Sequence, residues 1–207
     1  MILAVLASDL QKNEIARSAF FLKHEVIFSE NNSLWTHHAA DVYIDLQFVN
    51  TKEKIAELEK LLPKLVLINS VSETLSEIHP DFIRINGWPG FLKGNLVEAA
   101  AGKEKQENAI KLFADQMVFV KDSPGFVSAR VVSMIINEAY FTWEAGTSSK
   151  EEIDIAMILG TGYPYGPFEW GEMIGLNRVA ALLKKLSLNN TVYEMAKSLV
   201  NVANEEL

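Results

Sequence analysis

The chain has 207 residues, of which 49% are hydrophobic and 22% charged, and its formal net charge is -8. This composition is that of an ordinary globular protein with one large or two small domains. The negative charge, without any cluster of Lys and Arg, argues against nucleic acid and anionic membranes as partners. The chain contains no cysteine, which excludes disulfides, thiolate zinc sites and a cysteine nucleophile and fits a cytoplasmic location.

The apolar stretch at the N-terminus is short. No run in the sequence approaches the roughly 20 apolar residues that span a bilayer. Residues Met1–Ala7 reach their apolar stretch without a preceding basic region. We therefore interpret them as a first strand and not as a signal peptide.

Short apolar runs alternate with helical patterns through the first half of the chain. Six strands are expected, over Ile2–Ala7, Glu25–Phe28, Asp41–Phe48, Lys64–Asn69, Phe82–Asn86 and Met117–Lys121. Helices are expected over Asn13–Leu22, through residues 55–62 and over Lys103–Phe113. This alternation predicts a mostly parallel sheet with right-handed crossovers, as a doubly wound α/β domain over residues 1–121.

The second half, residues 122–207, reads as an all-α domain. It opens with Ser123 as a helix cap and Pro124 at the first helical position of a helix ending near Ala145. This helix is apolar around most of its circumference, so we expect it to pack on its own domain and on a partner. A capping box starts the next helix. The later helices are expected over Ser149–Gly160, Phe168–Ile174, Asn177–Leu186 and Val192–Leu207.

Four motifs follow one another in this second half. Asp122–Val127 with Arg130 resembles D-T-P-G-F-[IV]-x-N-R, and Glu151–Met157 resembles E-D-I-D-x-A-M. Gly162–Glu169 resembles G-[FY]-P-M-G-P-F-E, and Ile174–Leu176 resembles [IV]-G-L. In this order and spacing, the motifs are similar to those of the 3-hydroxyacyl-CoA dehydrogenase family.

The resemblance implies a Rossmann-like NAD domain followed by an all-α, 6-phosphogluconate-dehydrogenase-like helical domain that forms a homodimer. It further implies NAD-linked oxidation of 3-hydroxyacyl-CoA to 3-oxoacyl-CoA, a reaction of fatty acid metabolism. The segment between Glu30 and Asp41 is much shorter here than in the family. In the family, that segment contributes to holding the CoA portion.

The same resemblance locates the cofactor positions. Ala4–Ala16 lies without gaps on A-V-I-G-A-G-T-M-G-S-G-I-A, which puts Ala7, Asp9 and Lys12 at the three glycine positions. Those glycines let the backbone approach a diphosphate, whereas the Asp9 carboxylate would repel it and Lys12 would offset only part of that repulsion. The alternative is an ordinary strand-to-helix turn with Asp9 as the N-cap. Glu30 stands where an acid would bind the ribose hydroxyls, or else lies in a solvated loop.

The catalytic positions are also replaced. Aligning Leu96–Glu98 on the family's L-V-E retains Glu98 and puts Asn86 at the position of the His general base. An amide cannot take the hydroxyl proton as hydride leaves. The resemblance further puts Val71 at the position of a substrate-contacting Ser, and Ala129 at that of an Asn that holds the substrate oxygen. Glu98 is then either a structural carboxylate or itself the base.

Three hypotheses of function follow, and one of them is that a retained cleft carries an activity unrelated to that of the family. In the preferred one, the chain keeps the dehydrogenase architecture without its redox chemistry and acts as a dimeric scaffold or as a binder of a small acyl-type ligand. In the alternative, it is an active but atypical oxidoreductase, acting on 3-hydroxyacyl-CoA or a related 3-hydroxy acid with Glu98 as base. We expect no metal site, because the four histidines do not share a ligand spacing with acidic residues.

Overall fold

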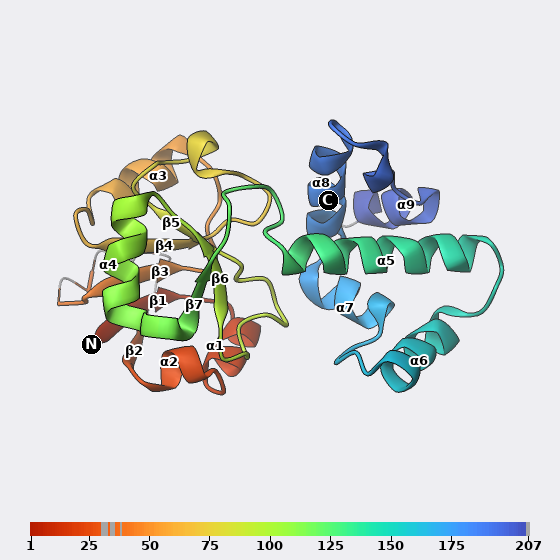
Figure 1. Cartoon of the computed structure of the whole chain (residues 1–207), viewed down its shortest axis with the longest axis horizontal. Coiled ribbons are helices and arrows are strands. Elements are labelled where there is room, and N and C mark those ends of the chain that lie inside the picture. The colour runs from red at the N-terminus through yellow and green to blue at the C-terminus, as the bar shows by residue number, and fades with distance from the viewer. Residues whose placement is uncertain (30–32, 34–35, 38, 206–207) are drawn as a thin grey trace. The chain divides into compact units, whose positions relative to one another are not determined.

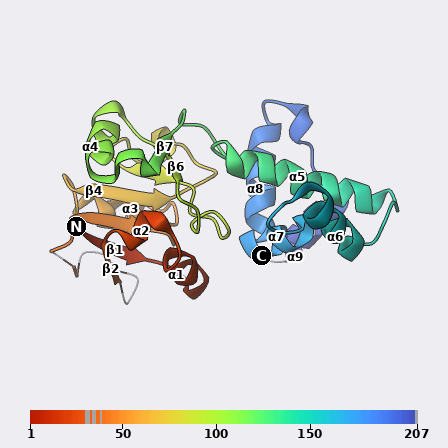
Figure 2. The same ribbon diagram turned by 60° about the horizontal axis from the view of Figure 1, so that its bottom comes forward.

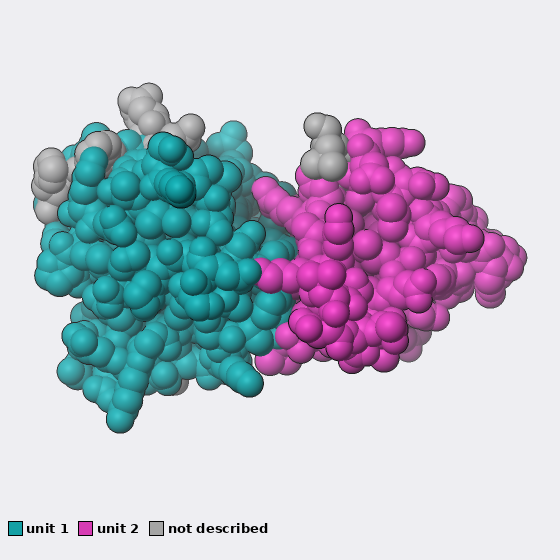
Figure 3. All heavy atoms as spheres, turned by 90° about the horizontal axis from the view of Figure 1, so that it is seen from above, with its two compact units in different colours: residues 1–126 teal, residues 127–207 magenta. Residues whose placement is uncertain are grey.

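The computed structural model describes the chain except residues 30–32, 34–35, 38 and 206–207, and the side chain of residue 115. It divides into two compact units, Met1–Phe126 and Val127–Leu207 (Figures 1 and 3). The segment after residue 121 stays with the first unit because two hydrogen bonds tie it there. The Asp122 carboxylate accepts from the Leu75 N–H at 2.9 Å, and the Gly125 N–H donates to the Val71 carbonyl at 2.8 Å.

Unit 1 is built on a sheet whose described strands run in the order β2-β1-β3-β4-β5-β6-β7. Neighbouring strands are parallel, except for the antiparallel pair β5 and β6. The doubly wound α/β fold predicted from the sequence is confirmed. The strands are β1 Ile2–Leu6, β2 Glu25–Phe28, β3 Val42–Asp45, β4 Leu65–Asn69, β5 Ile83–Ile85, β6 Val97–Ala100 and β7 Met117–Phe119.

Strand β6 is absent from the six predicted strands. Its sequence, Val-Glu-Ala-Ala, contains residues that are depleted in strands, so local propensity does not reveal it. It forms because β5 and β7 both pair with it. The pairing places Arg84 opposite Ala100 and Ile85 opposite Ala99, so the next residues along, Asn86 and Glu98, become neighbours.

Helices cover both faces of the sheet, as Figures 1 and 2 show. One face packs against the side chains of α1, α2 and α4, and the other packs against α3. The predicted helix over residues 13–22 is in fact two shorter helices. The helices of unit 1 are α1 Asp9–Ile15, α2 Ala19–Leu22, α3 Lys52–Glu59 and α4 Lys103–Phe113. The central strands are buried on both faces, as expected for a covered parallel sheet.

Unit 2 is all α, as predicted. Its α-helices are α5 Ser128–Glu144, α6 Lys150–Thr161, α7 Pro167–Ile174, α8 Leu176–Ser187 and α9 Lys197–Glu205. The predicted helix over Val192–Leu207 begins later, at Lys197, because the buried Asn137 amide holds the preceding backbone in a turn. Its Nδ2 donates to the Glu194 carbonyl at 2.8 Å and its Oδ1 accepts from the Ala196 N–H at 3.0 Å. No helix in the described part of the chain is long and apolar enough to cross a membrane.

The predicted start of α5 is wrong. Ser123 and Pro124 lie in a turn, and α5 begins only at Ser128. Gly125 and Phe126 interrupt the helical path because both adopt left-handed backbone conformations, with φ of 82° and 49°. A phenylalanine rarely adopts this conformation. Here its ring lies under the Arg84 guanidinium, whose Cζ is 4.6 Å from the ring centroid.

The motifs that form α6 and the turn before α7 fit together in space. The predicted capping box of Ser149 and Glu152 is confirmed at the start of α6. One turn further on, the Asp154 carboxylate caps α7 by accepting from the Phe168 N–H at 2.8 Å and the Glu169 N–H at 3.0 Å. Gly166 must be glycine, because a Cβ there would lie 2.1 Å from Asp154 Cγ.

Candidate functional site at the carboxyl edge of the sheet

The carboxyl ends of β1 and β3 meet where the strand order reverses, which is the edge at which open α/β sheets bind ligands. The predicted cofactor positions Ala7, Asp9 and Lys12 lie here, in the turn from β1 into α1 and in that helix. Glu30, the predicted ribose-binding acid, lies outside the described residues. The chemistry of this edge is therefore set by how the β1–α1 turn is built.

Ser8, and not Asp9, caps α1. The Ser8 hydroxyl accepts from the Gln11 N–H at 3.3 Å, and the Gln11 side chain returns to the Ser8 N–H at 3.0 Å. Asp9 instead begins the helix, with its side chain 96% exposed and 3.2 Å from Lys12 Nζ. The expectation that Asp9 is the N-cap is thus wrong, and its charge pair with Lys12 lies at the surface.

The Gln11 side chain fills the inner side of this sheet edge and bonds to the backbone there. It is only 1% exposed, and its Nε2 donates to the Leu46 carbonyl at 3.2 Å and the Gly87 carbonyl at 3.0 Å. One amide thereby joins the β1–α1 turn to the loops that follow β3 and β5. Sequence reasoning missed Gln11, although the spacing Ser-x-x-Gln is the signal of a capping box.

These residues do not fit a dinucleotide. A diphosphate needs free N–H groups at the start of the helix and a backbone that it can approach closely. Here two of those N–H groups are already engaged: the Gln11 N–H donates to the Ser8 hydroxyl, and the Ser8 N–H donates to the side-chain oxygen of Gln11. Gly87 packs so closely against Leu46 that a Cβ at position 87 would lie 2.9 Å from Leu46 Cδ2. The Gln11 amide, which donates to the Gly87 carbonyl, therefore contacts protein on its inner side. At the same turn, one of the family's glycine positions holds Asp9, whose carboxylate is exposed.

Glu14 is a second residue that the sequence did not single out. It is 8% exposed, and its two carboxylate oxygens accept from the Gly90 N–H at 2.6 Å and the Leu92 N–H at 3.2 Å. Glu14 therefore fastens the loop after β5 onto α1. A glutamate within a helix carries no sequence signal for such a contact, since its partners lie far along the chain.

The structure brings the predicted pair Asn86 and Glu98 together. The Asn86 N–H donates to the Glu98 carbonyl at 3.0 Å, and Asn86 Nδ2 lies 3.5 Å from Glu98 Oε2. Asn86 is 2% exposed, and its Oδ1 accepts from the Trp88 N–H at 3.4 Å. The amide thus has an acceptor on one side and a donor on the other. It orders the start of the following loop and offers no group that exchanges a proton.

The other two predicted substrate positions present no polar side chain. Val71 is buried at 3% exposure, and its backbone carbonyl accepts from the Gly125 N–H and from Arg84 Nη2. Ala129 is fully buried in the first turn of α5, in unit 2.

Arg84 gives a structural reason for Asp122, the first residue of the motif at Asp122–Val127. It is fully buried within β5, and it donates from Nε to the Ser70 carbonyl at 2.9 Å and from Nη2 to the Val71 carbonyl at 3.1 Å. Its Nη1 pairs with Asp122, the first residue of the motif. Burial lowers the pKa of Arg84, and the Asp122 carboxylate opposes that effect. The signal available in the sequence was a lone charge within an apolar strand, which is rare unless paired.

Comparison with known proteins agrees with these motifs. Residues 125–205 match the family model of the 3-hydroxyacyl-CoA dehydrogenase C-terminal domain. The 3-hydroxyadipyl-CoA dehydrogenase of Escherichia coli is 46% identical over 67 residues, which are 32% of this chain and 14% of that protein. The 3-hydroxybutyryl-CoA dehydrogenase of Clostridioides difficile is 48% identical over 69 residues, or 33% of this chain and 25% of that protein. The chain thus matches these curated relatives over a quarter of their length or less.

Solved structures extend the likeness to both units. The crystal structure of (S)-3-hydroxybutyryl-CoA dehydrogenase from Ralstonia eutropha matches with a TM-score of 0.73 at 19% identity, over 99% of this chain and 93% of that chain. At this identity the likeness shows the fold, a Rossmann-like domain followed by a helical domain. The sequence match itself places residues 125–205, which form the helical unit, in the 3-hydroxyacyl-CoA dehydrogenase C-terminal domain family.

Proposed function

We propose that this chain has lost the NAD-linked oxidation of 3-hydroxyacyl-CoA and acts as a dimeric scaffold or ligand-binding protein. The observation that carries the proposal is the Asn86–Glu98 pair. A buried amide occupies the position of the general base, and it is engaged by the Glu98 side chain and the Trp88 backbone. Removing a hydride from a 3-hydroxyl requires a group that takes the hydroxyl proton, and Asn86 cannot do so.

The cofactor side supports the same conclusion. The buried Gln11 amide joins β1, β3 and β5 at the edge where a diphosphate would bind. A loss of base alone would slow the reaction, whereas a closed cofactor edge removes the hydride acceptor as well. We therefore expect the chain to bind neither NAD nor NADH at micromolar concentration.

Two measurements test this proposal. Calorimetric titration with NADH is expected to give no heat of binding, and NAD is expected to stay oxidised in the presence of 3-hydroxybutyryl-CoA. Micromolar NADH binding by the unmodified chain, or substrate-dependent NAD reduction, would overturn the proposal.

The second candidate is an atypical oxidoreductase with Glu98 as base. One observation favours it: Glu98 is only half-buried and lies directly beside the position of the missing imidazole. Any NAD-linked turnover should then vanish in Glu98→Gln and survive in Asn86→Ala. Turnover that survives Glu98→Gln would exclude Glu98 as the base.

Assembly as a homodimer is supported by apolar residues that unit 2 leaves exposed. On α5, Val131 is 53% and Trp143 37% exposed, and on α6, Ile155 is 56% and Leu159 79% exposed. Large apolar side chains exposed on two helices of one unit support a contact site there, since apolar patches on a protein surface mark such sites. Light scattering at micromolar concentration is expected to give a dimer, and Leu159→Lys to weaken it. A stable monomer of the unmodified chain would contradict this proposal.

A further inference from the structure

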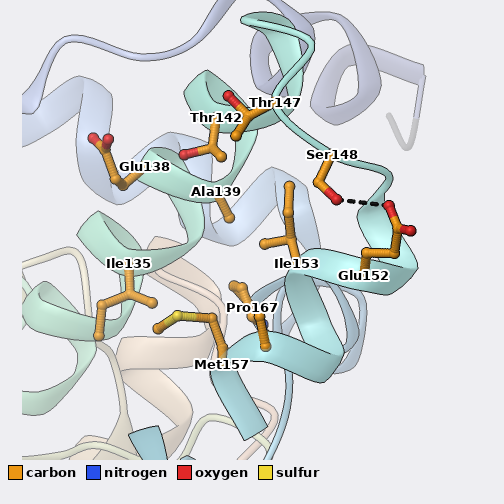
Figure 4. A pocket seen from close by; sticks show the side chains of 11 residues that line it. Ile135, Glu138, Ala139, Thr142, Thr147, Ser148, Glu152, Ile153, Met157 and Pro167 are labelled. Atoms are coloured by element: carbon orange, nitrogen blue, oxygen red, sulfur yellow. Dashed lines mark hydrogen bonds between the residues drawn. The ribbon is translucent and has the colours of Figure 1, made fainter. Parts of the chain in front are cut away.

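The loop that joins β5 to β6 is attached to the rest of unit 1 in two different ways. Its first residue, Gly87, is fixed at the sheet edge, because its carbonyl accepts from Gln11 Nε2 and its N–H donates to Asn69 Oδ1, both at 3.0 Å. Residues 88–94, which we call the strap, bind to the α1–α2 segment instead. Unlike the apolar cavity between α5, α6 and α7 (Figure 4), this loop is not built on the helices of the proposed dimer contact.

Two side chains, Glu14 and Ser18, hold the strap by its backbone. The Glu14 carboxylate accepts from the Gly90 N–H at 2.6 Å and from the Leu92 N–H at 3.2 Å, and Ser18 Oγ donates to the Gly94 carbonyl at 3.2 Å. Glu14 is 8% and Ser18 0% exposed. Their spacing of four residues puts both side chains on one face of the helical path. Together they form a catch for the strap.

The catch residues serve the strap and not their own helices. Ser18 stands at the N-cap of α2, where a serine side chain usually accepts from the helix backbone, but here it makes no such bond. Glu14 forms no ion pair with any residue that the structure describes, so its carboxylate is held by the two strap N–H groups. Water can replace those donors when the strap leaves, and the net cost of release is therefore modest compared with that of breaking a buried ion pair.

The strap can leave the catch without opening the sheet. Its hydrogen bonds to α1 and α2 are not strand-pairing bonds, whereas the bond from the Asn86 N–H to the Glu98 carbonyl lies before Gly87 and stays with the sheet. The strap also keeps a turn of its own, because the Phe91 N–H donates to the Trp88 carbonyl at 3.1 Å. Segments that are held by few contacts outside the core open locally, at a lower free energy than global unfolding.

We propose that the strap is a lid on the candidate site at the carboxyl edge of the sheet, and that it pivots at Gly87 and opens as a unit while the sheet stays folded. On opening, Glu14 loses its two N–H donors and Asn86 Oδ1 loses the Trp88 N–H. A ligand of this edge therefore competes with the strap and supplies hydrogen-bond donors, such as hydroxyl or amino groups, in its place. The inference concerns access to the edge and does not rest on the loss of the dehydrogenase reaction.

Thiol labelling tests the opening, because the chain has no cysteine of its own. Leu92→Cys puts a single thiol in the strap, and Leu67→Cys puts one in β4; both leucines are 0% exposed, so the two variants are matched. Without denaturant, iodoacetamide is expected to label position 92 at least about tenfold faster than position 67, which reacts only on global unfolding. Hydrogen exchange on the unmodified chain makes the same comparison, between the Gly90 and Leu92 N–H groups and those of β4. Equal rates in the strap and in β4 would overturn the proposal.

Variants of the catch show what holds the strap. Glu14→Gln combined with Ser18→Ala should speed labelling at position 92 at least about tenfold further, because the strap loses hydrogen bonds that include one to a charged acceptor. Asn13→Ala, on the exposed side of α1, should leave that rate unchanged. Labelling at position 67 should stay slow in both variants. If the catch variant instead speeds labelling at positions 92 and 67 equally, Glu14 and Ser18 support the whole fold and the proposal is wrong. Neither result alters the NADH titration, so the two proposals fail separately.

Discussion

The buried Gln11 amide offers the sharpest test of how the sheet edge is built. In Gln11→Met the side chain keeps its length but loses its polar atoms. The Gly87 carbonyl then loses the Nε2 donor at 3.0 Å, and the Ser8 N–H loses its acceptor at 3.0 Å. The Leu46 carbonyl also loses the Nε2 donor at 3.2 Å but keeps Asn69 Nδ2 at 3.1 Å. A hydrogen bond contributes about 1 kcal/mol net, and a buried group left without its partner costs about 1–3 kcal/mol. We therefore expect a loss of about 2–4 kcal/mol in the free energy of unfolding.

Urea unfolding followed by circular dichroism measures this loss, with Gln106→Met on α4 as the control. Gln106 is only half-buried, so its substitution should change stability by about 0.5 kcal/mol or less. A Gln11→Met variant as stable as the unmodified chain would show that the amide does not hold the edge together. If the unmodified chain also bound NADH, the edge would be a working cofactor site, and our account of the lost reaction would fail with it.

Three further outcomes are expected. Asp154→Ala should cost about 1–2 kcal/mol by thermal unfolding, because α7 loses its cap, whereas Asp154→Asn, which keeps one acceptor, should cost less. Asp122→Asn should lower the free energy of unfolding by about 3 kcal/mol, because it leaves the fully buried Arg84 cation without its carboxylate. A change below about 1 kcal/mol would show that this pair does not support the turn before α5. Burial lowers the pKa of His24 below 6.5 in the folded chain, so as the pH falls the unfolded chain takes up the proton before the folded chain does. The stability that the neutral His24 contributes is therefore present above about pH 6.5 and is lost as the pH falls below it. His24→Gln should therefore flatten the decline in melting temperature between about pH 7.5 and about pH 5.5, and an equally steep decline would contradict this.

Structural features that depend on residues close together in the sequence were predicted correctly. Continuous apolar runs predicted the buried parallel strands, because a covered strand needs apolar residues on both faces. The capping box of Ser149 and Glu152 was predicted correctly, since its partners are three residues apart. The resemblance of the later motifs led to the right family, and it put Asn86 and Glu98 at positions that the structure makes adjacent.

Only the tertiary structure decided which polar residues build the candidate site. Gln11, Glu14 and Arg84 have partners that lie far away in sequence, so no local pattern reveals them. The left-handed Phe126, which delays the start of α5, depends in the same way on a guanidinium from β5. The sequence by itself determined the fold class, and its resemblance to the family supplied Asn86 and Glu98 as candidate positions. Whether a polar residue lines a ligand site or closes it depends on contacts between distant strands, which form only when the sheet assembles.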